Sequence, residues 1–200
     1  DPETAGHSAG WQMDRIDRRL AGVTASEEVP KVTERLFGEA RERLGGHIGG
    51  GLVGVTVLTD GAILEGQADF VCSMLRKRDV PGYLAMIDRG ATTTWEHWAG
   101  DRSRIHNCFN GIGAWFVQAL GGIRPDERDP GYRHILFRPQ TPAGIRWVRA
   151  TKETPYGTAA IDWEIAEGRF AAHIVVPANS PPTLFPPDGL RTCELVRPTT

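Results

Sequence analysis

The sequence predicts an α+β fold in two parts, with helices first and antiparallel strands after them. Apolar residues recur at helical spacing before about residue 125 and alternate with polar residues after residue 130. Proline-rich turns separate the alternating segments. A run of helices followed by a run of strands favours segregated elements over a sheet with interleaved helices. We therefore predict one domain over residues 1–124 and another over residues 130–200, with a linker inside Arg124–Gly131.

Apolar stripes mark the helices predicted for the first part. The stripes run from Val32 to Leu44, from Leu64 to Leu75 and from Ile112 to Leu120, and residues at this spacing share one face of a helix. Gly61–Lys77 is the clearest predicted helix, and a weaker one covers Trp11–Ala21.

Alternation marks the strands predicted for the second part. Ala159–Ile165 and Phe170–Val176 place apolar side chains on one face, and Glu167-Gly168 lies between them as a turn. This pattern is typical of a β-hairpin with one buried face. Tyr132–Arg138 and Ile145–Glu153 are predicted as further strands.

The composition excludes several classes of partner. Lys and Arg number 23 against 25 Asp and Glu, so the net charge is −2, and no basic run favours nucleic acid or an anionic membrane as a partner. No apolar stretch is long enough to span a bilayer, and nothing near the start resembles a signal peptide. The compartment, cytoplasmic or secreted, stays open. Cys72, Cys108 and Cys193 are widely spaced and odd in number, which favours reduced structural thiols.

One motif is misleading. Gly49-Gly-Gly-Leu-Val-Gly54 has the glycine spacing of a dinucleotide-binding loop. That fingerprint needs a strand before it and a helix that opens at it, whereas a helical stretch ending at Leu44 precedes it here. We therefore expect no dinucleotide cofactor.

The segment Gly90–Phe116 carries the richest chemistry. Titratable side chains stand among two tryptophans in it: Glu96, His97, Asp101 and His106 with Trp95 and Trp98. Rings that stack on a pyranose, next to carboxylates and imidazoles that bind its hydroxyls, suit sugar recognition. The alternative is structural, with core tryptophans and a solvated acid–histidine pair.

Several stretches together resemble one enzyme family. Gly82–Trp98, which contains Gly90-Ala-Thr-Thr-Thr-Trp-Glu-His-Trp98, and Ser103–Phe116 are similar to two signature segments of the bacterial-type α-L-rhamnosidases of glycoside hydrolase family 78. Gly45–Gly54 resembles a glycine-rich loop of that family, and Gly121–Pro139 resembles the stretch that leads into its C-terminal β-domain. The likeness runs in the family's order from about Glu27 to Pro187.

The resemblance implies both a fold and a reaction. The first part would be the C-terminal helices of an (α/α)6 barrel, and the second an antiparallel β-sandwich. The enzymes invert configuration as they release L-rhamnose from rhamnose-containing glycosides or oligosaccharides. The family's general base falls on Glu96 and its sugar-binding histidine on His106, while Trp98 and Trp95 would help to wall the rhamnose site. No metal or organic cofactor is implied.

The resemblance also implies what the chain lacks. The family's general acid lies in an upstream acidic motif that is absent here, so we expect it before Asp1. Asp101, Glu65 and Asp69 could serve in principle, but nothing in their sequence context favours them. We expect the full-length parent to be the glycoside hydrolase and the 200-residue chain alone to be inactive.

Two other hypotheses stay open. The chain could be a non-catalytic carbohydrate-binding or remnant protein, which rhamnose binding measured by calorimetry would support. The parent could instead be a helical hydrolase of another sugar specificity, which a panel of substrates would separate from a rhamnosidase.

Overall fold

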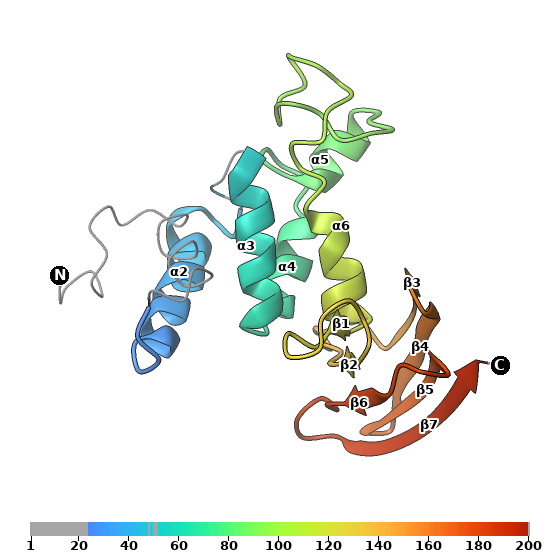
Figure 1. The fold of residues 1–200 in the computed structure, drawn as a ribbon. Coiled ribbons are helices and arrows are strands. Elements are labelled where there is room, and N and C mark those ends of the chain that lie inside the picture. The colour runs from blue at the N-terminus through green and yellow to red at the C-terminus, as the bar shows by residue number, and fades with distance from the viewer. Residues whose placement is uncertain (1–23, 48, 50–51, 200) are drawn as a thin grey trace. The chain divides into compact units, whose positions relative to one another are not determined.

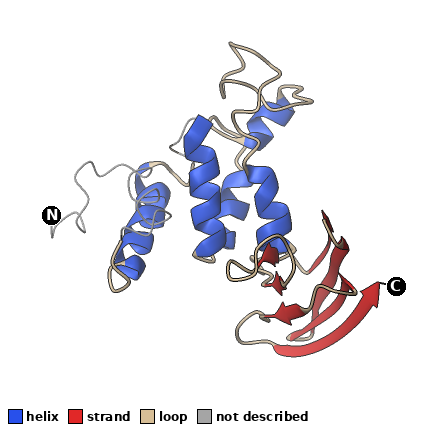
Figure 2. Ribbon diagram, viewed as in Figure 1, coloured by secondary structure: helices blue, strands red, loops and turns tan. Residues whose placement is uncertain are grey.

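The chain divides into two compact units. The computed structural model describes residues 24–47, 49 and 52–199 (Figure 1), and its division falls between Ile112 and Gly113. Helices come first along the chain and strands follow (Figure 2), so the predicted two-part α+β fold is confirmed. The helix predicted for Trp11–Ala21 lies outside the described residues. The domain limits of 1–124 and 130–200 stay a prediction.

The first unit is helical. Its described helices are α2 (Val29–Arg43), α3 (Leu52–Leu64), α4 (Ala68–Leu75) and α5 (Tyr83–Asp88). The stripe predicted for α2 is confirmed at Val32, Leu36, Phe37 and Ala40, all of which are buried. Phe37 meets Phe70 of α4 edge-on, with ring centroids 5.1 Å apart, so these two apolar faces pack together.

The prediction of a single helix over Gly61–Lys77 is wrong, because the chain turns between Leu64 and Ala68. Gly66 has φ +68°, and the N–H of Gln67 donates to the carbonyl of Ala62 at 2.9 Å. A left-handed glycine with this hydrogen bond ends a helix in a Schellman motif. The apolar spacing continues across the turn, so periodicity alone missed it.

The second unit opens with the last helix. α6 (Ile112–Trp115), at the division between the units, runs into a π-helical turn, η2 (Phe116–Leu120), and the predicted helix over Ile112–Leu120 is confirmed. Donors from the rest of the unit bond the last carbonyls of η2: Trp163 Nε1 to Leu120 O at 2.8 Å, Arg124 Nε to Gln118 O at 2.7 Å and Gln140 N to Ala119 O at 2.8 Å. These carbonyls have no partner within a helix, so the β-structure caps the helix end.

Two sheets follow. β1 (Ile123–Pro125), β2 (Ile135–Phe137) and β6 (Pro182–Leu184) form a three-stranded sheet, and β3 (Trp147–Thr154), β4 (Gly157–Ala166), β5 (Arg169–Pro177) and β7 (Arg191–Thr199) form a four-stranded one. A single buried cluster joins side chains of both sheets: Ile123, Ile135, Phe137, Ala159, Ile161, Trp163, Phe170, Ala172, Ile174 and Val176. This shared core is the arrangement of a β-sandwich.

The sheets are antiparallel except where β6 joins β2 and β7 joins β5, both in parallel. These parallel pairs differ from the purely antiparallel strands predicted for the second part. The chain leaves β5, visits the other sheet as β6 and returns as β7. Such a crossover brings the strand back in the same direction.

The predicted hairpin is confirmed. β4 and β5 pair from Ala166 and Arg169 at the turn, and Trp163 and Phe170 are completely buried. Glu167 and Gly168 have φ values of 51° and 70°, as two-residue turns that match the strand twist require.

The other two predicted strands are present with shifted limits. Tyr132–Arg138 shortens to β2, because Tyr132 lies in a turn with φ 67°. Ile145–Glu153 becomes β3.

Candidate active site

The candidate site lies in the loops between α5 and α6. Gly90 ends α5 with φ +85°, and the N–H of Ala91 donates to the carbonyl of Met86 at 3.0 Å. This is a second Schellman cap, and it releases the chain into the Thr-rich stretch that precedes Glu96. Figure 1 shows these loops in green to yellow beyond α5.

Hydrogen bonds join the two arms of this loop. The N–H of His106 donates to the carbonyl of Thr94 at 2.9 Å, and the N–H of Glu96 donates to the carbonyl of Ser103 at 2.9 Å. The Thr94 hydroxyl also lies 2.5 Å from the carbonyl oxygen of His106. Glu96 and His106, ten positions apart by number, therefore belong to one hydrogen-bonded ribbon.

Glu96 is half-buried and is held at one oxygen. Its Oε2 accepts a hydrogen bond from the N–H of Ser103 at 3.3 Å. Within the part of the chain that the structure describes, Oε1 has no hydrogen-bond partner. One carboxylate oxygen is thus anchored, and the other can accept a proton.

The hydrogen bond to His106 sets its tautomer. The N–H of Cys108 donates to Nδ1 at 3.0 Å, so Nδ1 is an acceptor and the neutral ring carries its proton on Nε2. The half-buried His106 can therefore offer an N–H donor to a ligand hydroxyl.

His97 and Asp101 form an exposed pair in the same loop. Nδ1 of His97 lies 2.5 Å from Oδ1 of Asp101, and the two side chains are 53% and 62% exposed. The hydrogen bond from His97 lowers the pKa of Asp101. A carboxyl group with a lowered pKa is poorly suited to act as a general acid at neutral pH.

Both tryptophans of the loop are buried. Trp98 stacks on Phe109 with ring centroids 3.8 Å apart and meets Tyr83 edge-on at 5.2 Å. The Tyr83 hydroxyl donates to the carbonyl of Phe109 at 2.9 Å, and burial raises the pKa of that hydroxyl. Trp98 therefore forms part of the core under the loop, and its role at a sugar site stays a prediction.

Trp95 is packed just as closely. A Cβ on Gly100 would lie 2.4 Å from Cζ3 of Trp95, and the Arg104 guanidinium lies 5.1 Å from the indole ring. Gly100 also has φ +70°. Trp95 thus anchors the turn between the two arms, and its contact with sugar also stays a prediction.

Sequence reasoning missed a contact that reaches this region from another loop. Nδ1 of His47 donates to the carbonyl of Pro81 at 2.7 Å, and Nε2 lies 3.0 Å from Oδ2 of Asp79. A backbone N–H and this imidazole lower the pKa of Asp79. Pro81 lies two residues before Tyr83, whose ring contacts Trp98. His47 therefore links the glycine-rich loop to this buried aromatic cluster. In the sequence, the glycine-rich stretch around His47 was the feature that could have pointed to this contact.

Metal-ligating clusters and membrane-spanning helices are both absent from the described ranges, residues 24–47, 49 and 52–199. No three His, Cys, Asp or Glu side chains in them gather in a way that could hold a metal ion. None of the helices in them is both long and apolar enough to cross a membrane. Cys72 and Cys108 are buried free thiols.

Comparison with known protein families agrees with the motifs. The family model for the bacterial α-L-rhamnosidase six-hairpin glycosidase domain matches residues 20–120, and that for the bacterial α-L-rhamnosidase C-terminal domain matches residues 122–196. The chain belongs to the bacterial α-L-rhamnosidase family. Its helical unit and its β-structure thus correspond to parts of two successive domains of these enzymes.

Relatives show how much of such an enzyme the chain represents. It is 28% identical over 166 residues to an α-L-rhamnosidase of Formosa agariphila and 30% identical over 149 residues to one of Streptomyces avermitilis. The chain spans 17% and 14% of their lengths, respectively.

Solved structures share the fold. An α-L-rhamnosidase from Dictyoglumus thermophilum matches with a TM-score of 0.80 and 26% identity, over 87% of this chain and 20% of that chain. The Streptomyces avermitilis enzyme, solved with L-rhamnose, matches with a TM-score of 0.81 and 24% identity, over 90% of this chain and 18% of that chain.

Proposed function

We propose that the chain is part of an inverting α-L-rhamnosidase that hydrolyses terminal α-L-rhamnosides, with Glu96 as the general base. The observation that carries this proposal is the hydrogen-bonded ribbon to which both Glu96 and His106 belong. A base and a hydroxyl-binding imidazole on one hydrogen-bonded loop suit attack on a bound sugar.

Glu96 would activate water. An inverting glycosidase places a carboxylate on one side of the sugar ring and an acid on the other, about 6.5–9.5 Å apart. The Ser103 N–H fixes Oε2 of Glu96, so Oε1 would take the proton as the water oxygen attacks the anomeric carbon. The acid on the opposite side would protonate the leaving oxygen.

His106 would bind the sugar rather than transfer protons. Its Nδ1 is occupied by the Cys108 N–H, so Nε2–H would donate to a rhamnose hydroxyl. Trp95 and Trp98 would hold this loop in shape from beneath and offer apolar contact to the C6 methyl at its edge. No metal or organic cofactor takes part in this scheme.

The general acid would lie outside this chain. Asp101, the acid nearest to Glu96 in sequence within the loop, is exposed and has a lowered pKa. The chain alone would therefore not cleave a rhamnoside, and hydrolysis would need the longer parent protein. Its substrate would be a rhamnose-containing glycoside or oligosaccharide, with neither nucleic acid nor a membrane as partner.

The test is Glu96→Gln in the parent enzyme, assayed with p-nitrophenyl α-L-rhamnoside. Loss of the general base should lower kcat by about a hundredfold or more. Asp101→Asn is the matched control, since it removes an exposed carboxyl from the same loop and should leave kcat nearly unchanged. Near-normal turnover of the Glu96→Gln enzyme would exclude this role for Glu96.

A further inference from the structure

The outer face of the three-stranded sheet carries two arginines. Ile123, Ile135 and Phe137 point into the shared core, so the residues between them face outward. Arg124 of β1 pairs with Leu136 of β2, and Arg138 follows two positions after Leu136. Arg124 and Arg138 therefore lie diagonally on the same face.

Arg124 is half-buried and incompletely bonded. Its Nε donates to the carbonyl of Gln118 at 2.7 Å, whereas Nη2 is buried and has no hydrogen-bond partner among the described residues. Burial, and next the charge of Arg138, lower the pKa of Arg124 to about 10. A buried polar group without a partner is rare and costly, and a like charge nearby adds to that cost.

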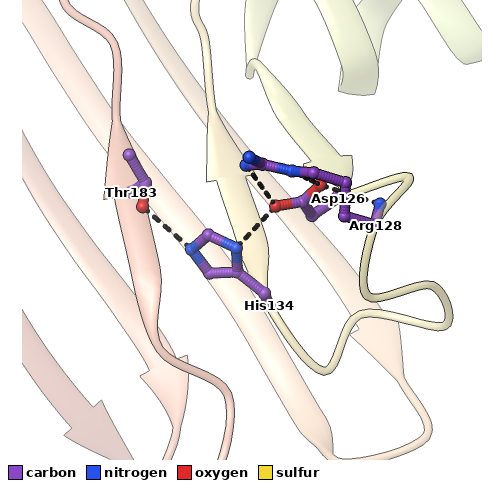
Figure 3. A network of polar contacts seen from close by, with 4 residues as sticks. All are labelled: Asp126, Arg128, His134 and Thr183. Carbon is purple, nitrogen blue, oxygen red and sulfur yellow. Dashed lines mark hydrogen bonds and ion pairs between the residues drawn. The ribbon is translucent and has the colours of Figure 1, made fainter.

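The acid that follows β1, Asp126, does not neutralise Arg124. Figure 3 shows Asp126 turned toward Arg128 and His134. It accepts hydrogen bonds from Arg128 N, Nε and Nη2 at 3.0, 3.2 and 3.0 Å and from His134 Nδ1 at 2.8 Å. His134 in turn lies 2.8 Å from the Thr183 hydroxyl. The oxygens of Asp126 are thus already occupied, chiefly by Arg128.

Arg138 is exposed and held over an aromatic ring. Its guanidinium carbon lies 4.2 Å from the ring centroid of Phe185, which orients the side chain through a cation–π contact. Within the described part of the chain, neither Arg124 nor Arg138 forms an ion pair. Two guanidinium groups thus share one face without a counter-ion.

We propose that Arg124 and Arg138 form a binding site for a small oxyanion, a phosphate or a carboxylate, on the outer face of the three-stranded sheet. Guanidinium groups present planar pairs of N–H donors that match such anions. The anion would bond the free donors of exposed Arg138, and the charge of half-buried Arg124 beside it would add to the attraction. This site is independent of the proposed glycoside hydrolysis.

Isothermal titration calorimetry on the 200-residue chain tests the proposal. Phosphate is titrated in one arm and acetate in the other, at fixed pH and with chloride keeping the ionic strength constant. We expect saturable binding of one anion per chain. Tighter binding of phosphate would identify a tetrahedral dianion as the ligand, and tighter binding of acetate would identify a carboxylate.

Variants locate the site. Arg138→Gln should weaken binding about tenfold or more, since a charge-assisted hydrogen-bond donor is lost. Arg138→Lys keeps the charge but not the planar pair of donors, and should lie between wild type and Arg138→Gln. Arg149→Gln is the matched control, because Arg149 is exposed on the other sheet and paired with Asp162 at 2.7 Å. Absence of binding in both arms, or equal binding by Arg138→Gln, would overturn the proposal.

Discussion

The Gly90–Gly111 loop and the β4–β5 hairpin each hold two chain segments side by side, but with different interactions. The loop does so with a few hydrogen bonds around half-buried Glu96 and His106. The hairpin does so with a full register of pairs and a completely buried Trp163. The proposed base and the proposed sugar-binding residue need access to substrate, and the loop leaves both half-buried. Substitutions should therefore affect geometry in the loop and stability in the hairpin.

The largest stability effect is expected at Trp163. Trp163→Ala removes a fully buried ring and the donor to the Leu120 carbonyl, which should cost about 3–5 kcal/mol of unfolding free energy. Trp147→Ala, on the neighbouring strand but 65% exposed, should cost about 0.5 kcal/mol or less. Urea denaturation measures both. Similar losses at the two sites would show that burial in the hairpin does not set its stability.

The loop is tested through a pair of glycines that both have positive φ. A methyl group on Gly100 would meet Trp95, whereas one on Gly90 meets nothing within 4 Å. Gly90→Ala should cost about 1–2 kcal/mol from backbone strain, and Gly100→Ala should lose a further 1–3 kcal/mol, roughly, from the clash. Urea midpoints compare the two. Equal losses would mean that Trp95 does not fix the turn.

Unfolding at acid pH tests how much the hydrogen-bonded Asp126 contributes to the stability of the β-structure. Hydrogen bonds from Arg128, and then from His134, hold the pKa of Asp126 well below its usual range. A lowered pKa stabilises the fold above the unfolded value of about 3.9, and this contribution is lost as the pH falls through the lower folded value. We expect the urea midpoint of wild type to fall below about pH 4, and that of Asp126→Asn to depend less on pH there.

Glu127→Gln is the control for that series, since it alters an exposed carboxyl in the same turn. If the urea midpoints of wild type and Asp126→Asn changed with pH in parallel, Asp126 would not be the source of the pH dependence.

The smallest expected effect is a gain at the hairpin turn. Glu167 has φ 51°, a conformation that asparagine adopts more readily than glutamate. Glu167→Asn should stabilise the fold by about 0.5–1 kcal/mol, measured as a rise in the urea midpoint. Glu167→Ala keeps the Cβ constraint and should give no such gain. A gain with alanine as well would point to charge rather than backbone strain.

Local sequence patterns predicted helices and strands correctly where a single hydrophobic periodicity determined them. The alternation in Ala159–Val176 and the turn at Glu167-Gly168 specify the hairpin, because side chains of a strand alternate between its faces. The pattern missed the break at Gly66, since the apolar spacing runs on through the cap. It also missed the parallel pairing of β6 and β7, because that pairing depends on distant segments rather than on local alternation.

Less of the candidate site could be predicted from sequence patterns. The residue types around Glu96 favoured sugar chemistry, and family resemblance assigned roles to Glu96 and His106. The ribbon that joins them and the Cys108 bond that sets the imidazole tautomer have no periodic signature. The contact of His47 with Pro81 likewise depends on loops that meet only after folding.

The bond between Trp163 and Leu120 has a consequence for synthesis on the ribosome. The donor lies 43 positions after the acceptor, and translation proceeds at roughly 5–20 residues per second. For about 2–9 s, the last helix exists without the indole that closes its end. The Leu120 carbonyl has no indole donor until β4 is made, so the end of the last helix can be closed only as the chain builds the sheet.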